Sequence, residues 1–300
     1  RGADEMPRYR ILHKTVYQYE AQVAASHHSA ILHPRDMPYQ ECVDFRLLIR
    51  PRPSNIRQRT DPFGNQITQF SLQAPHARLE VLATSSVVVR PRLIPPVAAT
   101  PSWEKVAAST RMPVGAEALE ACQFAFPSPH VPVWKGLEDF TRAVATPERP
   151  WLETVAELNR KVHAHVSFSP GETRVGTTVE QVFTRRKGVC QDIAHLMLAC
   201  LRCLGLPGRY MSGYIRTKPP EGKARLVGAD ASHAWVSAFC PGLGWIEMDP
   251  TNNLLPEGDH ITIGYGRDFS DVSPLSGVLV GGGEHIVTVG VDVHPEADPA

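Results

Sequence analysis

The chain has 300 residues, 42% of them apolar and 21% charged, and its 31 basic and 31 acidic side chains give a net charge of zero. This length and apolar content predict one large or two medium domains with a hydrophobic core. The absence of a basic run argues against nucleic acid as the main partner. No stretch reaches the roughly 18–20 consecutive apolar residues of a membrane span.

The N-terminus and the cysteines bear on location. Residues 1–8 lack the apolar segment of a signal peptide; we interpret Met6 as the natural first residue, with a leader already removed as the alternative. Six widely spread cysteines in a large chain favour free thiols in a reducing cytoplasm over a disulfide framework. Cys200 and Cys203 are close in sequence, but no second pair completes a metal-ligand pattern. We therefore predict a cytoplasmic protein without a metal or another cofactor.

Short strands are predicted throughout residues 1–95. Alternating polar and apolar side chains, separated by turn residues, predict strands at residues 8–20, 26–34, 42–50, 57–72 and 78–90. The fourth segment contains Asp-Pro-Phe-Gly-Asn at 61–65, which is typical of a turn. This pattern predicts an antiparallel, sandwich-like β domain.

Residues 96–150 are rich in proline. Because proline fixes φ and lacks an N–H donor, long regular elements are not expected there. We predict a linker with short helices near residues 116–122 and 137–144.

Residues 151–300 mix helices and strands. Apolar residues at helical spacing predict a helix over 154–166, and a second begins after Thr178, with Gln181 at the distance of a capping box. A third helix runs from Cys190 to a Gly-Leu-Pro-Gly stop signal. Strands are predicted at residues 209–216, 232–239, 244–249, 261–263 and 285–293.

Cys190 lies at the start of this third helix, after Gly188, which is expected to permit a sharp turn. It shares the apolar stripe formed by Ile193, Ala194, Met197, Cys200, Leu201 and Leu204. A thiol at a helix N-terminus meets the positive end of the backbone dipoles and free N–H groups, which favour the thiolate. Because the thiolate is the nucleophile, we predict that Cys190 is placed to react; a buried structural thiol is the alternative.

A predicted hairpin carries a histidine and an aspartate. His233 lies in one alternating segment, and Asp249 closes the next. A polar loop at 217–231 precedes them, and we expect it to shape substrate entry. A three-residue loop would put Asp249 opposite His233, and a five-residue loop one step diagonal, on the same face in both cases. A carboxylate beside an imidazole fixes its tautomer and stabilises the imidazolium. A structural histidine and a turn-capping carboxylate are the alternative.

Three segments resemble the motif blocks of the transglutaminase-like superfamily: Gly-Val-Cys-Gln-Asp at 188–192, Ser-His-Ala-Trp at 232–235 and Trp-Ile-Glu-Met-Asp-Pro-Thr-Asn at 245–252. Their order and spacing agree with that family. The β-rich N-terminal region with its turn at 61–65, and the segment 260–272, resemble the bacterial members, so the resemblance covers nearly the whole chain. It implies an α+β fold in which a papain-like core, with a cysteine-bearing helix packed on an antiparallel sheet, follows the β domain.

The resemblance also implies roles for individual residues. Cys190 is the expected nucleophile, His233 the general base and acid, and Asp249 the orienting carboxylate. The backbone N–H of Cys190 is one expected donor to the oxyanion. The second donor stays open, and the candidates for it or for substrate contact are Gln181, Gln191, Trp235 and a residue near Phe168.

The predicted chemistry is acyl transfer from an amide through a thioester. We favour hydrolysis of a peptide or isopeptide bond in a peptide or protein substrate, because the bacterial relatives are suspected peptidases and the sequence lacks clustered acidic loops like those that hold calcium in animal transglutaminases. A true transglutaminase that joins glutamine acyl groups to amines is the first alternative, and a catalytically inactive interaction protein the second. No membrane or nucleic-acid partner is expected, and the oligomeric state is left open.

Overall fold

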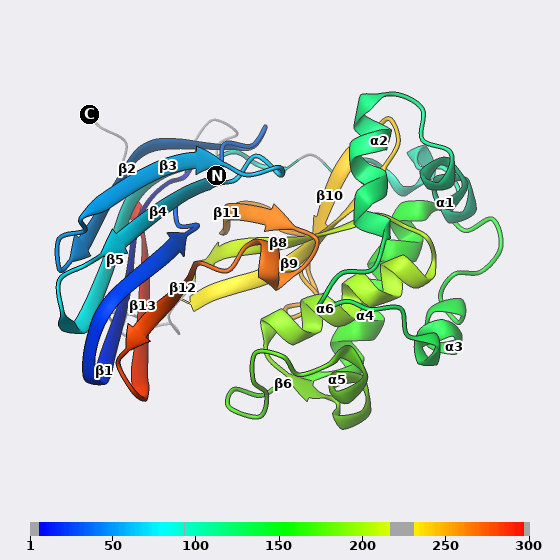
Figure 1. Ribbon diagram of the computed structural model, residues 1–300. Helices are drawn as coiled ribbons and strands as arrows, with labels where there is room; N and C mark the ends of the chain where they lie inside the picture. The colour runs from blue at the N-terminus through cyan, green and yellow to red at the C-terminus, as the bar shows by residue number, and fades with distance from the viewer. Residues whose placement is uncertain (1–5, 93, 217–230, 297–300) are drawn as a thin grey trace, which may run out of the picture.

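The computed structural model describes residues 6–92, 94–216 and 231–296. Figure 1 shows two parts side by side: a curved antiparallel sheet built around the long first strand, and an α+β part with a smaller sheet. The predicted α+β class is confirmed. Residues 217–230, which make up almost all of the predicted polar loop, lie outside the described residues.

One long strand is the centre of the N-terminal sheet. β1 (Arg8–Ala30) is continuous where the sequence predicts two strands, over 8–20 and 26–34. Its pairing with β5 shifts register between Gln18 and Val23, so an irregularity within one strand replaces the expected break. The other strands are β2 (Gln40–Arg50), β3 (Asn55–Thr60), β4 (Gln66–Leu72) and β5 (His76–Val89), in the order β2-β5-β1-β4-β3.

Two strands from the far end of the chain complete this sheet. β12 (Leu275–Gly281) and β13 (His285–Glu296) both pair antiparallel with β1 (Figure 1). The sequence analysis missed β12 and grouped the late strands with the core of residues 151–300. Pairing between the two ends of a chain leaves no signal in the local pattern, which is why neither the missing strand nor the partner was predicted.

Residues 96–150 form short helices that cover the second part. They are α1 (Trp103–Arg111), α2 (Ala116–Cys122) and α3 (Glu138–Arg142), with 3-10 turns at Val97–Ala99, Gln123–Ala125 and Lys135–Leu137. Helices were predicted at the positions of α2 and α3, but α1 was missed. Pro101 and Pro113 bracket α1 and lie outside it, so these prolines bound a helix without breaking it. Val106, Val131 and Leu137 are buried in the same core cluster as the cysteine-bearing helix, so the segment is packed on the core.

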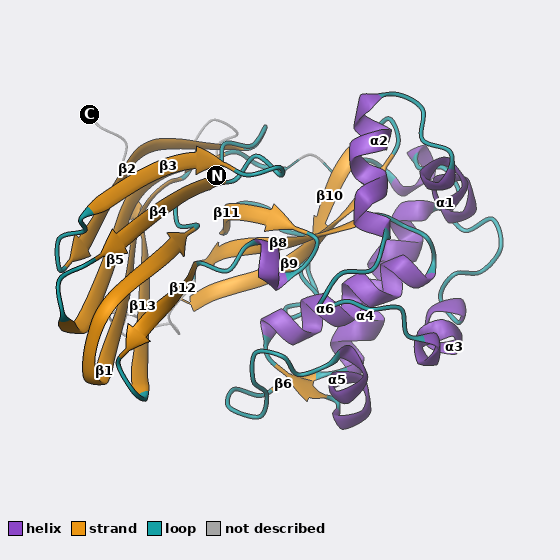
Figure 2. Ribbon diagram, in the orientation of Figure 1, coloured by secondary structure: helices purple, strands orange, loops and turns teal. Residues whose placement is uncertain are grey.

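The second part has an antiparallel sheet with helices gathered around it (Figure 2). Its order is β10-β9-β8-β11, from β8 (Gly208–Ile215), β9 (Ala231–Cys240), β10 (Gly244–Met248) and β11 (His260–Gly266). The remaining elements are α4 (Trp151–His165), β6 (Ser167–Phe168), α5 (Val179–Arg185), β7 (Lys187–Gly188), α6 (Cys190–Cys203) and the 3-10 turn η4 (Phe269–Asp271).

The helix α6 lies at the centre of this part. Every residue from 192 to 201 is buried, and the helix contacts β9 and β8. The predicted cysteine-bearing helix on an antiparallel sheet is therefore confirmed. Among the helices of the described residues, none combines the length and the apolar character needed to cross a bilayer.

The predicted turn at residues 61–65 joins the two parts. Asp61 accepts hydrogen bonds from the backbone N–H groups of Phe63 and Asn65, which closes the turn. Asn65 is fully buried, and its side chain bonds both the N–H and the C=O of Tyr265 in β11. A Cβ on Gly264 would lie 2.7 Å from Oδ1 of Asn65, so only glycine allows this close contact. The turn thus fixes the N-terminal sheet against β11.

Candidate active site

Cys190 is half-buried at the first position of α6. Asp192 closes the first turn of the helix, because its Oδ2 accepts the N–H of Val189 at 2.8 Å and the hydroxyl of Thr173 at 2.6 Å. A Cβ on Gly188 would lie 2.9 Å from the Cβ of Asp192. Gly188 therefore leaves Asp192 the space to cap the helix. This close approach of the Asp192 side chain is the reason for a glycine at position 188.

β9 and β10 form the predicted hairpin, but their three-residue turn is 241–243, one residue later than the loop at 240–242 for which the opposite register was expected. The register pairs Val236 with Met248. Continued by one residue, it places Asp249 opposite Trp235 and one step diagonal from His233. Of the two registers considered from the sequence, the diagonal one is therefore observed, and it keeps both side chains on one face.

Asp249 is fully buried and accepts five hydrogen bonds. Oδ1 accepts the backbone N–H groups of Thr251 at 2.9 Å and Asn252 at 3.1 Å. Oδ2 bonds Nε2 of His233 at 2.7 Å, Nε2 of His260 at 2.9 Å and Nδ2 of Asn252 at 2.7 Å. Burial alone would raise the pKa of Asp249, but the bonds from both imidazoles and the charge of His233 lower it far below its usual range. Asp249 is therefore an ionised carboxylate at neutral pH.

His233 lies between Asp249 and Cys190. Burial alone would lower the pKa of His233, but hydrogen bonds with Asp249 and with the Cys190 thiol, and the charges of both groups, raise it from 6.5 to about 9. Because Nε2 bonds Asp249, Nδ1 is the nitrogen left to exchange a proton with the sulfur. The structure thus joins His233 to Asp249, and the effect of Cys190 on the pKa of His233 indicates that the sulfur lies near the same ring.

His260, the first residue of β11, also belongs to this cluster and was not among the predicted site residues. The sequence held one signal for it, since it opens the segment 260–272 that resembles the family. Its closeness to Asp249 depends on the pairing of β11 with β8, which the local pattern does not reveal.

Two of the predicted oxyanion or substrate candidates have other partners. The side-chain oxygen of Gln181 accepts the N–H of Thr178 at 3.2 Å in the predicted capping box. Nε1 of Trp235 donates to Oε2 of Glu247 at 2.8 Å. The single indole N–H of Trp235 is therefore engaged, and we do not retain Trp235 as an oxyanion donor; the bond of Gln181 uses its side-chain oxygen, so its side-chain nitrogen stays a candidate donor. Gln191, half-buried and directly after the cysteine, stays a candidate.

Glu247 is a second buried carboxyl group in the hairpin. The hydroxyl of Tyr39 donates to its Oε1, and Nη2 of Arg92 lies 3.2 Å from its Oε2. Burial raises the pKa of Glu247 to about 8. Because Tyr39 precedes β2 and Arg92 follows β5, this cluster ties the hairpin to the N-terminal sheet.

The side chains around Asp249 include a set that resembles a metal site. The ligand atoms of His233, Asp249 and His260 all lie within 4.8 Å of one another. The two contacts to Oδ2, at 2.7 and 2.9 Å, are ordinary hydrogen-bond distances. Hydrogen bonding accounts for the arrangement, so we assign no metal to it.

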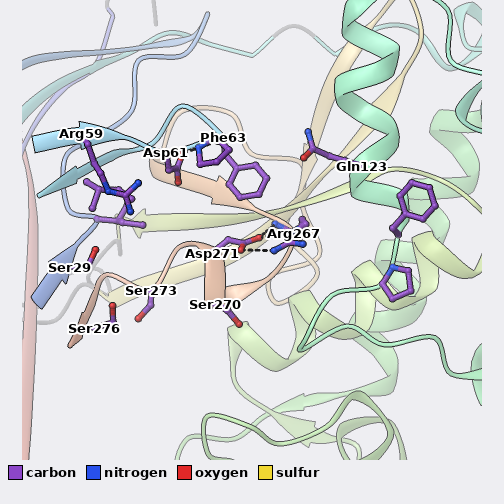
Figure 3. A pocket seen from close by; sticks show the side chains of 15 residues that line it. Ser29, Arg59, Asp61, Phe63, Gln123, Arg267, Ser270, Asp271, Ser273 and Ser276 are labelled. Carbon is purple, nitrogen blue, oxygen red and sulfur yellow. Dashed lines mark hydrogen bonds and ion pairs between the residues drawn. The ribbon is translucent and has the colours of Figure 1, made fainter. Parts of the chain in front are cut away.

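A cavity of about 680 Å³ lies where the two parts meet (Figure 3). Arg59 and Phe63 line it from the N-terminal part, and Arg267 and Asp271 from the segment after β11. Arg267 and Asp271 form a two-point ion pair at 2.9 and 3.0 Å, drawn as dashed lines. The lining residues include no member of the cluster around Asp249, so we do not assign the cavity to that site.

A cysteine-bearing helix packed on an antiparallel sheet that carries a His–Asp pair, after an N-terminal β sheet, defines a transglutaminase-like protein of the bacterial type. Family comparison agrees, since residues 9–88 match the bacterial transglutaminase-like N-terminal region and residues 138–250 match the transglutaminase-like superfamily. The chain belongs to the transglutaminase-like superfamily. Membership supports cysteine-based acyl transfer as the general chemistry.

Three similar proteins put this membership in context. An uncharacterized protein of Mycobacterium tuberculosis is 35% identical over 299 residues, covering 96% of this chain and 93% of the relative. A protein-glutamine gamma-glutamyltransferase of Pseudomonas aeruginosa is 30% identical over 121 residues, covering 40% of this chain and 18% of that protein. A crystal structure from Cytophaga hutchinsonii, provisionally assigned as a cysteine protease, has a TM-score of 0.75 at 20% identity and covers 99% of this chain and 93% of its own. This last similarity shows a shared fold.

Proposed function

We propose that the protein hydrolyses amide bonds, with Cys190 as nucleophile, His233 as general base and acid, and Asp249 as the carboxylate that orients the imidazole. One observation carries the proposal: His233 bonds Asp249 through Nε2 at 2.7 Å, and Cys190 acts on the same ring by raising its pKa. Superfamily membership supports the cysteine-based chemistry.

The reaction runs in two steps. In the first step, Cys190 acts as a thiolate beside the His233 imidazolium, and its sulfur attacks the amide carbonyl carbon. The C–N bond then breaks, Nδ1 of the imidazolium gives its proton to the leaving amine, and a thioester and a neutral His233 remain. In the second step, neutral His233 takes a proton from water as the water attacks the thioester; the C–S bond breaks, the carboxylic acid leaves, and the thiolate and imidazolium are restored. Asp249 stays ionised and stabilises the imidazolium in both steps.

The tetrahedral oxyanion in each step needs hydrogen-bond donors. The backbone N–H of Cys190, at the start of α6, is one donor in this proposal, and Gln181 and Gln191 are the candidates for the second. Losing one donor costs about 2.7–4 kcal/mol of barrier in a well-studied protease, so the second donor has a large effect on the rate.

Transglutamination is the alternative, and it shares every step up to the thioester. The two reactions differ in whether water or an amine takes the acyl group. The 121-residue match to the Pseudomonas protein-glutamine gamma-glutamyltransferase favours the alternative, but it covers only 18% of that protein. We favour water because the sequence lacks the clustered acidic loops of calcium-dependent transglutaminases.

Replacing the nucleophile tests the proposal. Cys190→Ala is expected to abolish release of amine from a library of fluorogenic peptide amides, because no other group replaces the thiolate. Cys200→Ala, a buried cysteine in the same helix, is the matched control and should keep its activity. Incubation with a glutamine peptide and a labelled amine then separates the two reactions, and stable incorporation of the amine would overturn hydrolysis.

Iodoacetamide labelling with peptide mapping tests Cys190 without a substrate. We expect Cys190 to react faster than Cys200 and Cys203, because burial raises the pKa of both of those thiols. Equal labelling of the three, with no activity lost in Cys190→Ala, would instead support a catalytically inactive interaction protein.

We also propose a peptide or protein as the substrate and the cytoplasm as its location. A peptide substrate follows from the amide chemistry. The wide spacing of the six cysteines supports a reducing compartment. Cell fractionation tests the location, and recovery of the protein outside the cytoplasm would contradict it.

A further inference from the structure

Asp249 shares one carboxylate oxygen between two imidazoles. Nε2 of His233 lies 2.7 Å and Nε2 of His260 lies 2.9 Å from the same Oδ2. His233 is carried by β9 and His260 by β11, which flank β8 on either side. His260 is 2% exposed, so water does not compete freely for this bond.

The packing over β8 fixes this second imidazole. A Cβ on Gly213, in β8, would lie 2.7 Å from the ring of Trp235, so the indole occupies the space that the glycine leaves. The same indole stacks near His233 and meets the ring of His260 edge-on, with centroids 5.1 Å apart. Arg92 donates to the backbone carbonyl of His260 at 3.2 Å. Backbone pairing, an aromatic wall and a buried guanidinium therefore all hold His260 in place.

The bond from His260 adds a donor without adding a charge. Burial lowers the pKa of His260 and exceeds the opposing effect of Asp249, so the ring is neutral at neutral pH. A neutral imidazole has one N–H, and a carboxylate only accepts, so the hydrogen lies on Nε2. His233 is thus left as the imidazole that carries the positive charge beside Asp249.

We propose that His260 is a positioning residue that holds Oδ2 of Asp249 toward His233. Oδ1 is fixed by backbone N–H groups, whereas Oδ2 is bonded by side chains. Without His260, Oδ2 keeps the bonds from His233 and from Asn252, an exposed side chain on the turn, so the carboxylate gains freedom to rotate. Loss of the N–H donor also leaves more negative charge on Oδ2, which would raise the pKa of His233. We expect the lost orientation to lower this pKa by more.

Nuclear magnetic resonance of the wild-type protein with ¹⁵N-labelled histidine tests the premise directly. His260 is expected to be neutral at pH 7–8 with its hydrogen on Nε2, and His233 to titrate near pH 9. A protonated His260, or a hydrogen on its Nδ1, would overturn the proposal whether or not any variant folds.

Three variants then test the positioning. His260→Phe keeps a ring but loses the donor, and we expect the titration midpoint of His233 to fall from about 9 toward 6.5 and Cys190 alkylation at pH 7 to slow about tenfold. His260→Gln returns an N–H donor and should restore most of the His233 titration midpoint and of the Cys190 alkylation rate. His28→Phe is the matched control, since it replaces a buried imidazole in β1 that stacks on Phe70, and it should leave His233 unchanged.

Two results with folded variants would reject the role. One is a His233 midpoint in His260→Phe that is unchanged or raised. The other is a His260→Gln protein that behaves like His260→Phe, because the donor would then be irrelevant. The use of this bond in acyl transfer rests on the proposed function, but the ring titrations do not. A protein that shows the expected shifts yet turns over no amide would count against the proposed function alone.

Discussion

Asp249 and Glu247 are two buried carboxyl groups in one hairpin, and their pKa values move in opposite directions. Burial raises the pKa of Glu247 to about 8. Burial acts on Asp249 as well, but hydrogen bonds from His233 and His260 lower its pKa far below the usual range. One carboxyl group therefore keeps its proton at neutral pH, and its neighbour two residues on is ionised.

The difference comes from the partners of each carboxyl group. Asp249 follows the last residue of β10, so the N–H groups of Thr251 and Asn252 in the next turn are free to bond its Oδ1. Glu247 lies inside β10, where it pairs with Ser237, and its carboxyl group is contacted by side chains alone. The imidazoles on Oδ2 therefore lower the pKa of Asp249 against burial, and the backbone N–H groups on Oδ1 hold the carboxylate in place.

Asp249→Asn is expected to have the largest effect. An amide has one oxygen, so it cannot accept both the backbone N–H groups at Oδ1 and the imidazole N–H groups at Oδ2. His233 then loses its orientation and its charge partner, and acyl transfer should fall by about 10⁴-fold, as in a serine protease with the same change. The rate is measured on a peptide amide found in the library screen, with Glu247→Gln as the matched control. A loss of less than tenfold would show that the carboxylate does not act through His233.

The pH dependence is expected to follow His233. Its pKa of about 9 means that kcat/KM should fall as pH rises through about 9, because the leaving amine then loses its proton donor. The free energy of unfolding should fall over the same pH range. Because the pKa of folded His233 is raised above 6.5, its protonation stabilises the fold fully below pH 6.5, and this contribution is lost as pH rises through about 9. Rates and urea midpoints between pH 6 and 10 measure both, and an alkaline limb that Asp249→Asn leaves at 9 would contradict the assignment.

The sequence was informative where the structure is local. The helix that begins at Cys190 follows from apolar spacing and a stop signal, and the approach of Asp249 to His233 follows from the period of two in a hairpin. The capping box of Thr178 and Gln181 was predicted for the same reason and is observed. The catalytic roles of these residues remain predictions.

Contacts between distant segments were not accessible to this reasoning. His260 reaches Asp249 only because β11 pairs with β8, and Trp235 was considered for the oxyanion because no local pattern reveals its bond with Glu247. The partners of β12 and β13 were missed on the same grounds, since β1 lies at the other end of the chain.

Glu247→Gln is expected to have the smallest effect on acyl transfer, within about twofold, because an amide resembles the neutral acid that Glu247 is below pH 8. At pH 5 the free energy of unfolding should change by less than about 0.5 kcal/mol. A carboxyl group whose folded pKa is raised stabilises the fold fully below 4.5, and loses this contribution as pH rises toward 8. The variant should therefore become more stable relative to wild type between pH 5 and 8.

Urea unfolding of both proteins at pH 5, 6.5 and 8 measures this trend. Nη2 of Arg92 lies 3.2 Å from Oε2 of Glu247, and this contact determines which result would contradict the prediction. If Glu247 were ionised and paired with Arg92, the amide would leave a buried guanidinium without its counter-ion and destabilise the fold by about 3–5 kcal/mol even at pH 6.5. That loss would show that the two neighbouring carboxyl groups of the hairpin are both charged, and that burial in the strand interior does not keep Glu247 neutral.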